Sequence, residues 1–371
     1  MKTILSVIFK FLAFIIAGLL VVTLPLSLVI YNTGQALFTP EVVARVSGAV
    51  FVDSELIPGA LEFVTNQRAE EISQEIEEQD EDNELNLFYL IEGMEVEDWR
   101  NIRKELLTDE ILDEWIQATV SVYYAWLDSE DQIPEIRWDM KPLIERMRGS
   151  PGEKVVTTFY NSLPDCTDLQ MEEMKTGEGE PLPKREMVEN LCKLSTFPHQ
   201  EQIKVYDEIL HLAVERIPPE YNFTQALVKE DSALQTPLAA KKQLREWRRM
   251  AELSLLLPLM LLFLILAFGV RSLTDLGQWW GIPLAGGSLI AFITSLLFKP
   301  LWTGLLSERM PGAVPSTSVL YHELISNSGR AISEVFNPLR WQSFLLLLIG
   351  LGFMVMGFVL KLGSGGKREG E

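Results

Sequence analysis

The stretch FLAFIIAGLLVVTLPLSLVI, residues 11–30, contains no charged side chain and decides the fold of this chain. A helix needs about 20 largely apolar residues to cross a hydrocarbon core of about 30 Å. Three later stretches have the same character, at 253–270, 281–298 and 344–360. Aromatic residues suited to the headgroup level stand at their ends: Tyr31, Trp279, Trp280, Trp302 and Trp341. We therefore predict an all-α integral membrane protein with four transmembrane helices.

Residues 1–32 are predicted to form an uncleaved N-terminal anchor. Lys2 and Lys10 precede the apolar run, and Gly34 and Ala36 have the small-residue spacing of a signal-peptidase site. The run is about twice as long as the usual 7–15-residue core of a signal peptide. Its length favours an anchor, with a cleaved signal peptide as the alternative.

An acidic domain separates the first span from the other three. Residues 33–250 contain 45 acidic and 22 basic side chains, a net charge of −23, whereas the whole chain carries −20. A field of this sign repels nucleic acid, so no nucleic-acid partner is expected. Residues 251–362 are predicted to form a three-helix membrane bundle with an outer amphipathic loop at 299–340. Residues 363–371, rich in glycine and charge, are expected to be a disordered tail.

The 33–250 domain is predicted to be mainly helical. Thr39 followed by Pro40 has the pattern of an N-cap and a first helical residue. Thr108 precedes a stripe of mostly apolar residues at helical spacing: Ile111, Leu112, Trp115, Thr119, Val122 and Trp126. A further helix is expected at about 199–217, and 133–138 is the only short candidate for a strand.

The charges that flank the spans give opposing indications of orientation. Lys2 and Lys10 precede the first span and no basic residue follows it before Arg45, which places the N-terminus inside. That orientation leaves nine basic residues in outer membrane-adjacent segments and six in short cytoplasmic ones. Because the first helix usually dominates, we expect a multi-pass cell-membrane protein with the 33–250 domain outside the cytoplasm.

The two cysteines, Cys166 and Cys192, are a candidate disulfide. Neither belongs to a Cys-x-x-Cys pair, which argues against most zinc and thioredoxin-like sites. In an exported domain they are expected to be bonded, whereas in a cytoplasmic domain two buried free thiols would be the default.

Two features of the membrane segments bear on function. The last three spans contain no ionisable residue in their interiors, which argues against an ion-coupled transporter. Gly287, Ala291 and Ser295 recur every four residues in the third span and are candidates for close helix packing. Packing within the bundle is a simpler role for this stripe than a dimer seam.

A basic face precedes the second span. It consists of Lys241, Lys242, Arg245, Arg248 and Arg249. Anionic headgroups would neutralise these charges, each worth about 1 kcal/mol near a charged surface. The alternatives are docking against the acidic domain and a topology signal that would place that domain inside the cell.

The search for catalytic and metal-binding motifs finds no site, so no catalytic residue, metal or cofactor is assigned. Asp80 could begin a calcium loop, but Leu85 and Ile91 stand where an EF-hand needs glycine and glutamate. His211 has Asp207 and Glu215 four residues to either side, a pattern that is commonly a surface charge arrangement.

Three functions remain open from the sequence. The first is a non-enzymatic envelope protein whose helical domain binds a protein partner or senses conditions at the membrane surface. The second is a permease-like or accessory transport subunit, since the order of segments resembles FtsX and MacB permeases in topology alone. The nine-residue link from 271 to 279 departs from that resemblance, because it has no room for a helix that couples to an ATPase. The third is a membrane-bound hydrolase.

Overall fold

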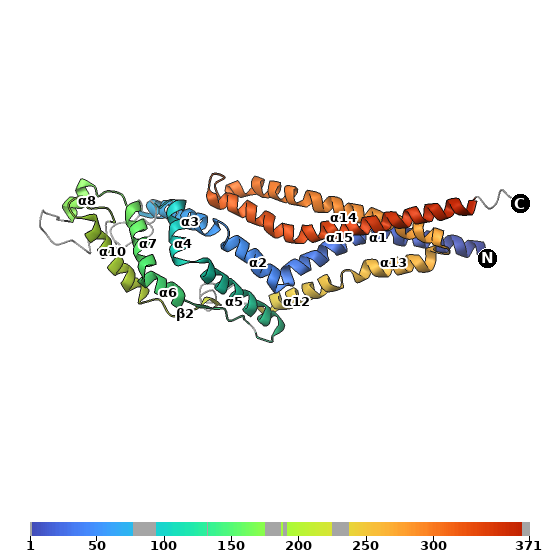
Figure 1. Cartoon of the computed structure of the whole chain (residues 1–371), viewed down its shortest axis with the longest axis horizontal. Helices are drawn as coiled ribbons and strands as arrows, with labels where there is room; N and C mark the ends of the chain where they lie inside the picture. The colour runs from blue at the N-terminus through green and yellow to red at the C-terminus, as the bar shows by residue number, and fades with distance from the viewer. Residues whose placement is uncertain are drawn as a thin grey trace. The chain divides into compact units, whose positions relative to one another are not determined.

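The computed structural model describes residues 2–76, 94–131, 133–174, 187, 191–224 and 237–365. The chain folds as two compact units. The membrane unit comprises residues 1–46, 236–309 and 327–371, and the acidic unit comprises 47–235 and 310–326. Most of the described chain is helical, and four long apolar helices are present, which confirms the predicted fold class (Figure 1).

The four long helices of the membrane unit are α1 (Lys2–Phe38), α13 (Leu256–Gly269), α14 (Leu273–Arg309) and α15 (Val319–Gly365). Helix α12 (Pro237–Leu253) leads into α13, and the two form one candidate span. A helix can satisfy most of its backbone hydrogen bonds within itself, which a span in hydrocarbon requires. The predicted tail begins inside α15, and residues 366–371 lie outside the described residues.

Helix α1 supplies much of the membrane-unit core. It lies alongside α13 and α14 (Figure 1) and buries a leucine-rich stripe against them. The buried members of this core are Ile16, Leu20, Leu24, Leu28, Leu261, Ile265, Leu284, Ala291, Phe336 and Leu339. The first helix is therefore part of the core of this unit, and the uncleaved anchor stays a prediction.

Helices α14 and α15 approach closely at glycines. A Cβ atom at Gly281 would lie 2.8 Å from the backbone nitrogen of Met354, and one at Gly350 would lie 2.6 Å from that of Ala285. Contact this close between two backbones requires residues without a side chain. The two helices are therefore packed through a glycine seam that the stripe at Gly287 did not predict.

The segment predicted as an outer loop at 299–340 is mostly helix. Helix α14 continues to Arg309, a single 3-10 turn, η2, covers Met310–Gly312, and α15 begins at Val319. The link between the second and third spans is also shorter than expected, since α13 ends at Gly269 and α14 begins at Leu273. Helix α2 (Pro40–Phe51) begins where Thr39 and Pro40 predicted.

The described part of the acidic unit consists of helices and one two-stranded sheet. Its helices are α3 (Leu56–Ile76), α4 (Val96–Leu106), α5 (Asp109–Asp128), α6 (Lys141–Arg148), α7 (Ser150–Ser162), α8 (Asp168–Glu173) and α10 (His199–Val214). Helix α5 starts directly after Thr108, as predicted. The predicted strand at 133–138 appears as β1 (Arg137–Asp139), which pairs antiparallel with β2 (Glu220–Asn222).

An aromatic stack holds the sheet against α5. The rings of Trp115 and Trp138 are stacked with centroids 4.9 Å apart, and Phe223 stacks on Trp138 at 5.1 Å. The Nε1 atom of Trp138 donates a hydrogen bond to Thr119 Oγ1 at 3.0 Å. Thr119, placed on the stripe by its spacing, is therefore a hydrogen-bonding member of this contact.

Candidate functional site

A cleft of about 600 Å³ lies in the acidic unit between α3 and the residues that join α14 to α15. We call it the α3 cleft. The α3 side consists of Glu62, Phe63, Asn66 and Gln67, which share one helix face. The other side consists of Pro311, Gly312, Ala313, Val314, Pro315, Thr317, Ser318 and Val319. Its volume falls within the range of about 300–1,000 Å³ that is common for ligand pockets.

Apolar contacts hold the two walls of the cleft together. Val314, Leu320 and Tyr321 are buried and pack against Phe63 and its neighbours on α3. Gly59 permits the close approach, since a Cβ atom there would lie 2.9 Å from the backbone nitrogen of Leu320. The cleft is therefore built on a packed base formed by parts of the chain far apart in sequence.

The first turn of α15 has a local cap on the cleft side. Ser318 Oγ donates to the carbonyl of Pro315 at 2.8 Å and accepts from the Tyr321 N–H at 3.2 Å. This arrangement satisfies one of the free N–H groups at the start of the helix. It fixes the backbone from Pro315 to Val319 along the cleft wall.

Glu62 is the one charged side chain in the described lining of the cleft. Partial burial raises the pKa of its carboxyl group, and the negative charge of Glu95 raises it further. A hydrogen bond from the backbone of Val96, at the start of α4, acts in the opposite direction. The carboxyl group is therefore held at the N-terminus of α4, partly removed from water and inside a negative local field.

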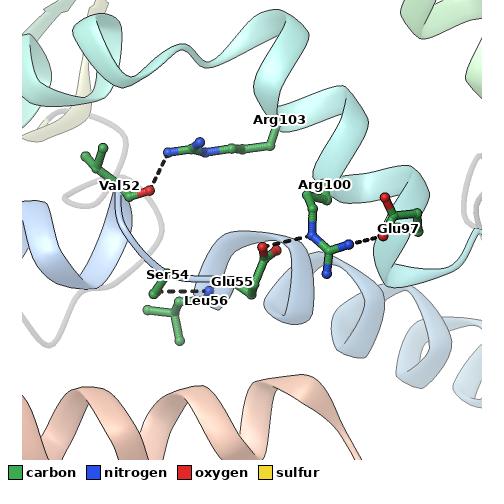
Figure 2. A network of polar contacts seen from close by, with 7 residues as sticks. All are labelled: Val52, Ser54, Glu55, Leu56, Glu97, Arg100 and Arg103. Carbon is green, nitrogen blue, oxygen red and sulfur yellow. Dashed lines mark hydrogen bonds and ion pairs between the residues drawn. The ribbon is translucent and has the colours of Figure 1, made fainter.

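Two arginines of α4 fix the chain where it enters α3 (Figure 2). Arg103 donates to the carbonyl of Val52 at 2.8 Å. It also forms an ion pair with Asp109 at 2.9 Å. Arg100 donates to Glu55 Oε1 at 2.8 Å and also pairs with Glu97. Because Glu55 directly precedes α3, these contacts set the position of the helix that carries Glu62.

The structure joins the cysteine pair and places it in a buried cluster. Cys166 and Cys192 form a disulfide with a Cα–Cα distance of 4.8 Å. Cys192 is 1% exposed and packs with Tyr160 and Leu194. The Gln202 side chain holds the backbone of Leu194 in this cluster. Its Oε1 accepts from the Leu194 N–H, and its Nε2 donates to the Leu194 carbonyl.

The five residues of the predicted basic face lie on α12 but have different surroundings. Lys241 is buried, Arg245 and Arg248 are half-buried, and Lys242 and Arg249 are exposed. Arg248 also contacts Glu252 at 3.4 Å. The face is therefore not a uniform charged surface, and its role in lipid contact, docking or topology stays a prediction.

The small-residue stripe on α14 is buried inside the membrane unit. Ala291 and Ser295 are 0% and 7% exposed. A Cβ atom at Gly287 would lie 3.1 Å from Leu24 Cδ2, so this glycine faces α1. The stripe accordingly packs within one chain.

No metal site emerges from the described part of the chain. On α10, His211 Nε2 lies 3.7 Å from Asp207 Oδ2. No group of three His, Cys, Asp or Glu side chains converges among the described residues. The candidate calcium loop counted from Asp80 lies outside the described residues.

Sequence reasoning did not identify the α3 cleft. Glu62 looks like one of many acidic residues, and Pro311 and Pro315 look like ordinary loop residues. The one available signal was the pair of prolines around Gly312, which indicates a rigid turn between two helices. Nothing local indicates that this turn packs against α3.

Comparison of the chain with protein-family models, curated proteins and solved structures gives no match. The fold therefore defines the class: the chain is a multi-span helical membrane protein whose spans contact lipid. The acidic unit with its α3 cleft distinguishes it from a simple membrane bundle.

Proposed function

We propose that this membrane protein is a non-enzymatic envelope receptor whose acidic unit lies outside the cytoplasm and binds a partner or senses conditions through the α3 cleft. The observation that carries this proposal is the origin of the cleft walls. One wall is α3, and the other is the connection 311–319 between the last two spanning helices.

This connection offers a route from binding to the membrane. The chain leaves the membrane unit at 309 and re-enters it at 327, so the cleft wall is continuous with α14 on one side and α15 on the other. A ligand that contacts Pro311 to Val319 would bear on the ends of both helices. Binding in the acidic unit would in this way change the position or dynamics of the spans, as a sensor requires.

The location is tested with a pair of single cysteines in intact cells. Leu212 on α10 is 62% exposed, and Ser272 is exposed between α13 and α14. With four spans, these two positions are expected on opposite sides of the membrane. We expect a membrane-impermeant maleimide to label Leu212→Cys in intact cells and Ser272→Cys only after lysis. The reverse pattern would place the acidic unit in the cytoplasm.

The binding role is tested by a photo-crosslinking amino acid at Asn66, on the cleft wall. The same group at Leu212, away from the cleft lining, is the matched control. We expect an adduct in intact cells that is specific to Asn66 and disappears in a Glu62→Arg background. Equal adducts at both positions, or none at Asn66, would count against the α3 cleft as a binding site.

A further inference from the structure

We infer that the α3 cleft binds an alkylammonium group, carried by a small free amine or by a lysine-type side chain. This inference rests on the proposed binding role of the cleft and specifies its ligand. It follows from three features of the cleft: the sign of its charge, its hydrogen-bonding groups and its apolar walls.

The charge of the cleft selects a cation. Glu62 is ionisable, Glu95 lies close enough to act on it, and the described lining contains no lysine or arginine. The connection 311–319 contributes no charged residue to oppose this field. The negative side chains would repel an anionic ligand here, whereas a cation would supply a counter-charge to a partly desolvated carboxylate.

The polar groups of the lining match an ammonium ion in particular. An ammonium group has three donors and no acceptor. The lining offers acceptors on both walls: the Glu62 carboxylate, the side-chain carbonyls of Asn66 and Gln67, and the Thr317 hydroxyl. A divalent metal is a poorer match, since no three carboxylate, histidine or cysteine groups meet within the described chain.

The apolar part of the lining suits a short hydrocarbon stem. Phe63 follows Glu62 directly on α3, and Pro311, Pro315 and Val319 stand on the opposite wall. A chain of a few methylene groups can lie along such surfaces while its charged end reaches the carboxylate. Phe63 is only partly buried, and the face of an aromatic ring attracts cations. A bare inorganic cation would make no apolar contact with these walls, because it has no hydrocarbon stem.

The test is calorimetric titration of the full chain in lipid nanodiscs with n-butylammonium and with Nα-acetyl-lysine methylamide. These probes distinguish a free amine from a lysine side chain. The Nα-acetyl-norleucine methylamide analogue, which lacks only the ammonium group, is the ligand control. We expect saturable binding of at least one amine, no measurable binding of norleucine, and weaker binding as the pH falls and Glu62 is protonated.

Two matched variants locate the binding. Glu62→Gln keeps the shape of the side chain and should weaken affinity at least tenfold, whereas Glu201→Gln, exposed on α10, should leave it unchanged. Thermal unfolding of both variants establishes that they remain folded. Equal amine affinity in wild type and both variants, or no saturable binding of either amine, would overturn the inference. An Asn66 adduct that persists without amine binding would leave the proposed receptor role standing.

Discussion

Asn32 on α1 donates a hydrogen bond from Nδ2 to Gln342 Oε1 on α15 at 2.7 Å, joining the first and the last spanning helix. Asn32 is 3% exposed, and the same nitrogen donates to the carbonyl of Leu28 at 2.8 Å. Both donors of a buried amide are thus satisfied inside an apolar unit, where an unpaired amide would be costly. The pair links two helices at positions that the sequence separates by 310 residues.

Substitutions at Asn32 and Gln342 should have non-additive effects on the free energy of unfolding, because the two side chains are hydrogen-bonded. Replacing Asn32 by Leu, Gln342 by Leu, and both together defines a double-mutant cycle. We expect a coupling energy of about 0.6 kcal/mol, and at most about 1.7 kcal/mol, which is the range for interhelical hydrogen bonds in membranes. Unfolding by steric trapping in bicelles measures it. Strictly additive effects would indicate that the bond contributes nothing to stability.

The glycine seam between α14 and α15 should not tolerate a methyl group. In Gly281→Ala the new Cβ would lie 2.7 Å from Met354 Cγ and 2.9 Å from the carbonyl oxygen of Gly350. Since backbone atoms cannot move aside alone, we expect a loss of about 1–3 kcal/mol. Gly352→Ala is the control, because nothing lies within 4 Å of its Cβ position. Equal stability of the two variants in the same unfolding assay would contradict the seam.

Loss of the disulfide should destabilise the acidic unit. The bonded cysteines are 26 positions apart, and a loop of that length corresponds to about 3.5 kcal/mol in the chain-entropy model. We expect Cys166→Ala with Cys192→Ala to lower the melting temperature of the acidic unit. A reductant should lower the wild-type value and leave the double variant unchanged. Two free thiols in the mass spectrum of unreduced wild-type protein would show that the bond does not form in cells.

The Glu62 carboxyl group should make stability depend on pH in a defined direction. Its pKa is raised in the folded state, first by partial burial and then by Glu95, so the folded chain binds this proton more readily than the unfolded chain does. The penalty for ionising it is therefore absent below the unfolded pKa, about 4.3, and grows as the pH rises through the folded value. Glu62→Gln should raise the melting temperature at pH 7.5 and have no such effect near pH 4.

Scans of melting temperature against pH, with Glu201→Gln as the exposed control, check this prediction. A gain for Glu62→Gln that is the same at both pH values would mean that the substitution acts through packing. A gain of the same size in Glu201→Gln would mean that the effect comes from the net charge of the chain.

The sequence by itself determined the four spans, the helical class and several helix starts. A spanning helix in hydrocarbon needs mostly apolar side chains and backbone hydrogen bonds made within the helix. Both requirements can be recognised from a local stretch of sequence. The starts after Thr39 and Thr108 are local for the same reason, since residue preferences at a helix start act within one turn, although the Thr108 side chain makes no cap hydrogen bond. Two cysteines also allow only one intramolecular disulfide. The sequence therefore identified the pair and did not establish whether the bond forms.

Only the tertiary structure decided which residues from distant parts of the chain contact each other. Glu62 became a cleft residue because Gly59 lets α3 pack against the start of α15, and Asn32 met Gln342 because the first and last spans lie together. Helix α14 also continues to Arg309, inside the segment that was expected to be an outer loop. Contacts between distant segments depend on how whole helices pack, and side-chain volumes at close approach set that packing. No local pattern of residues contains this information.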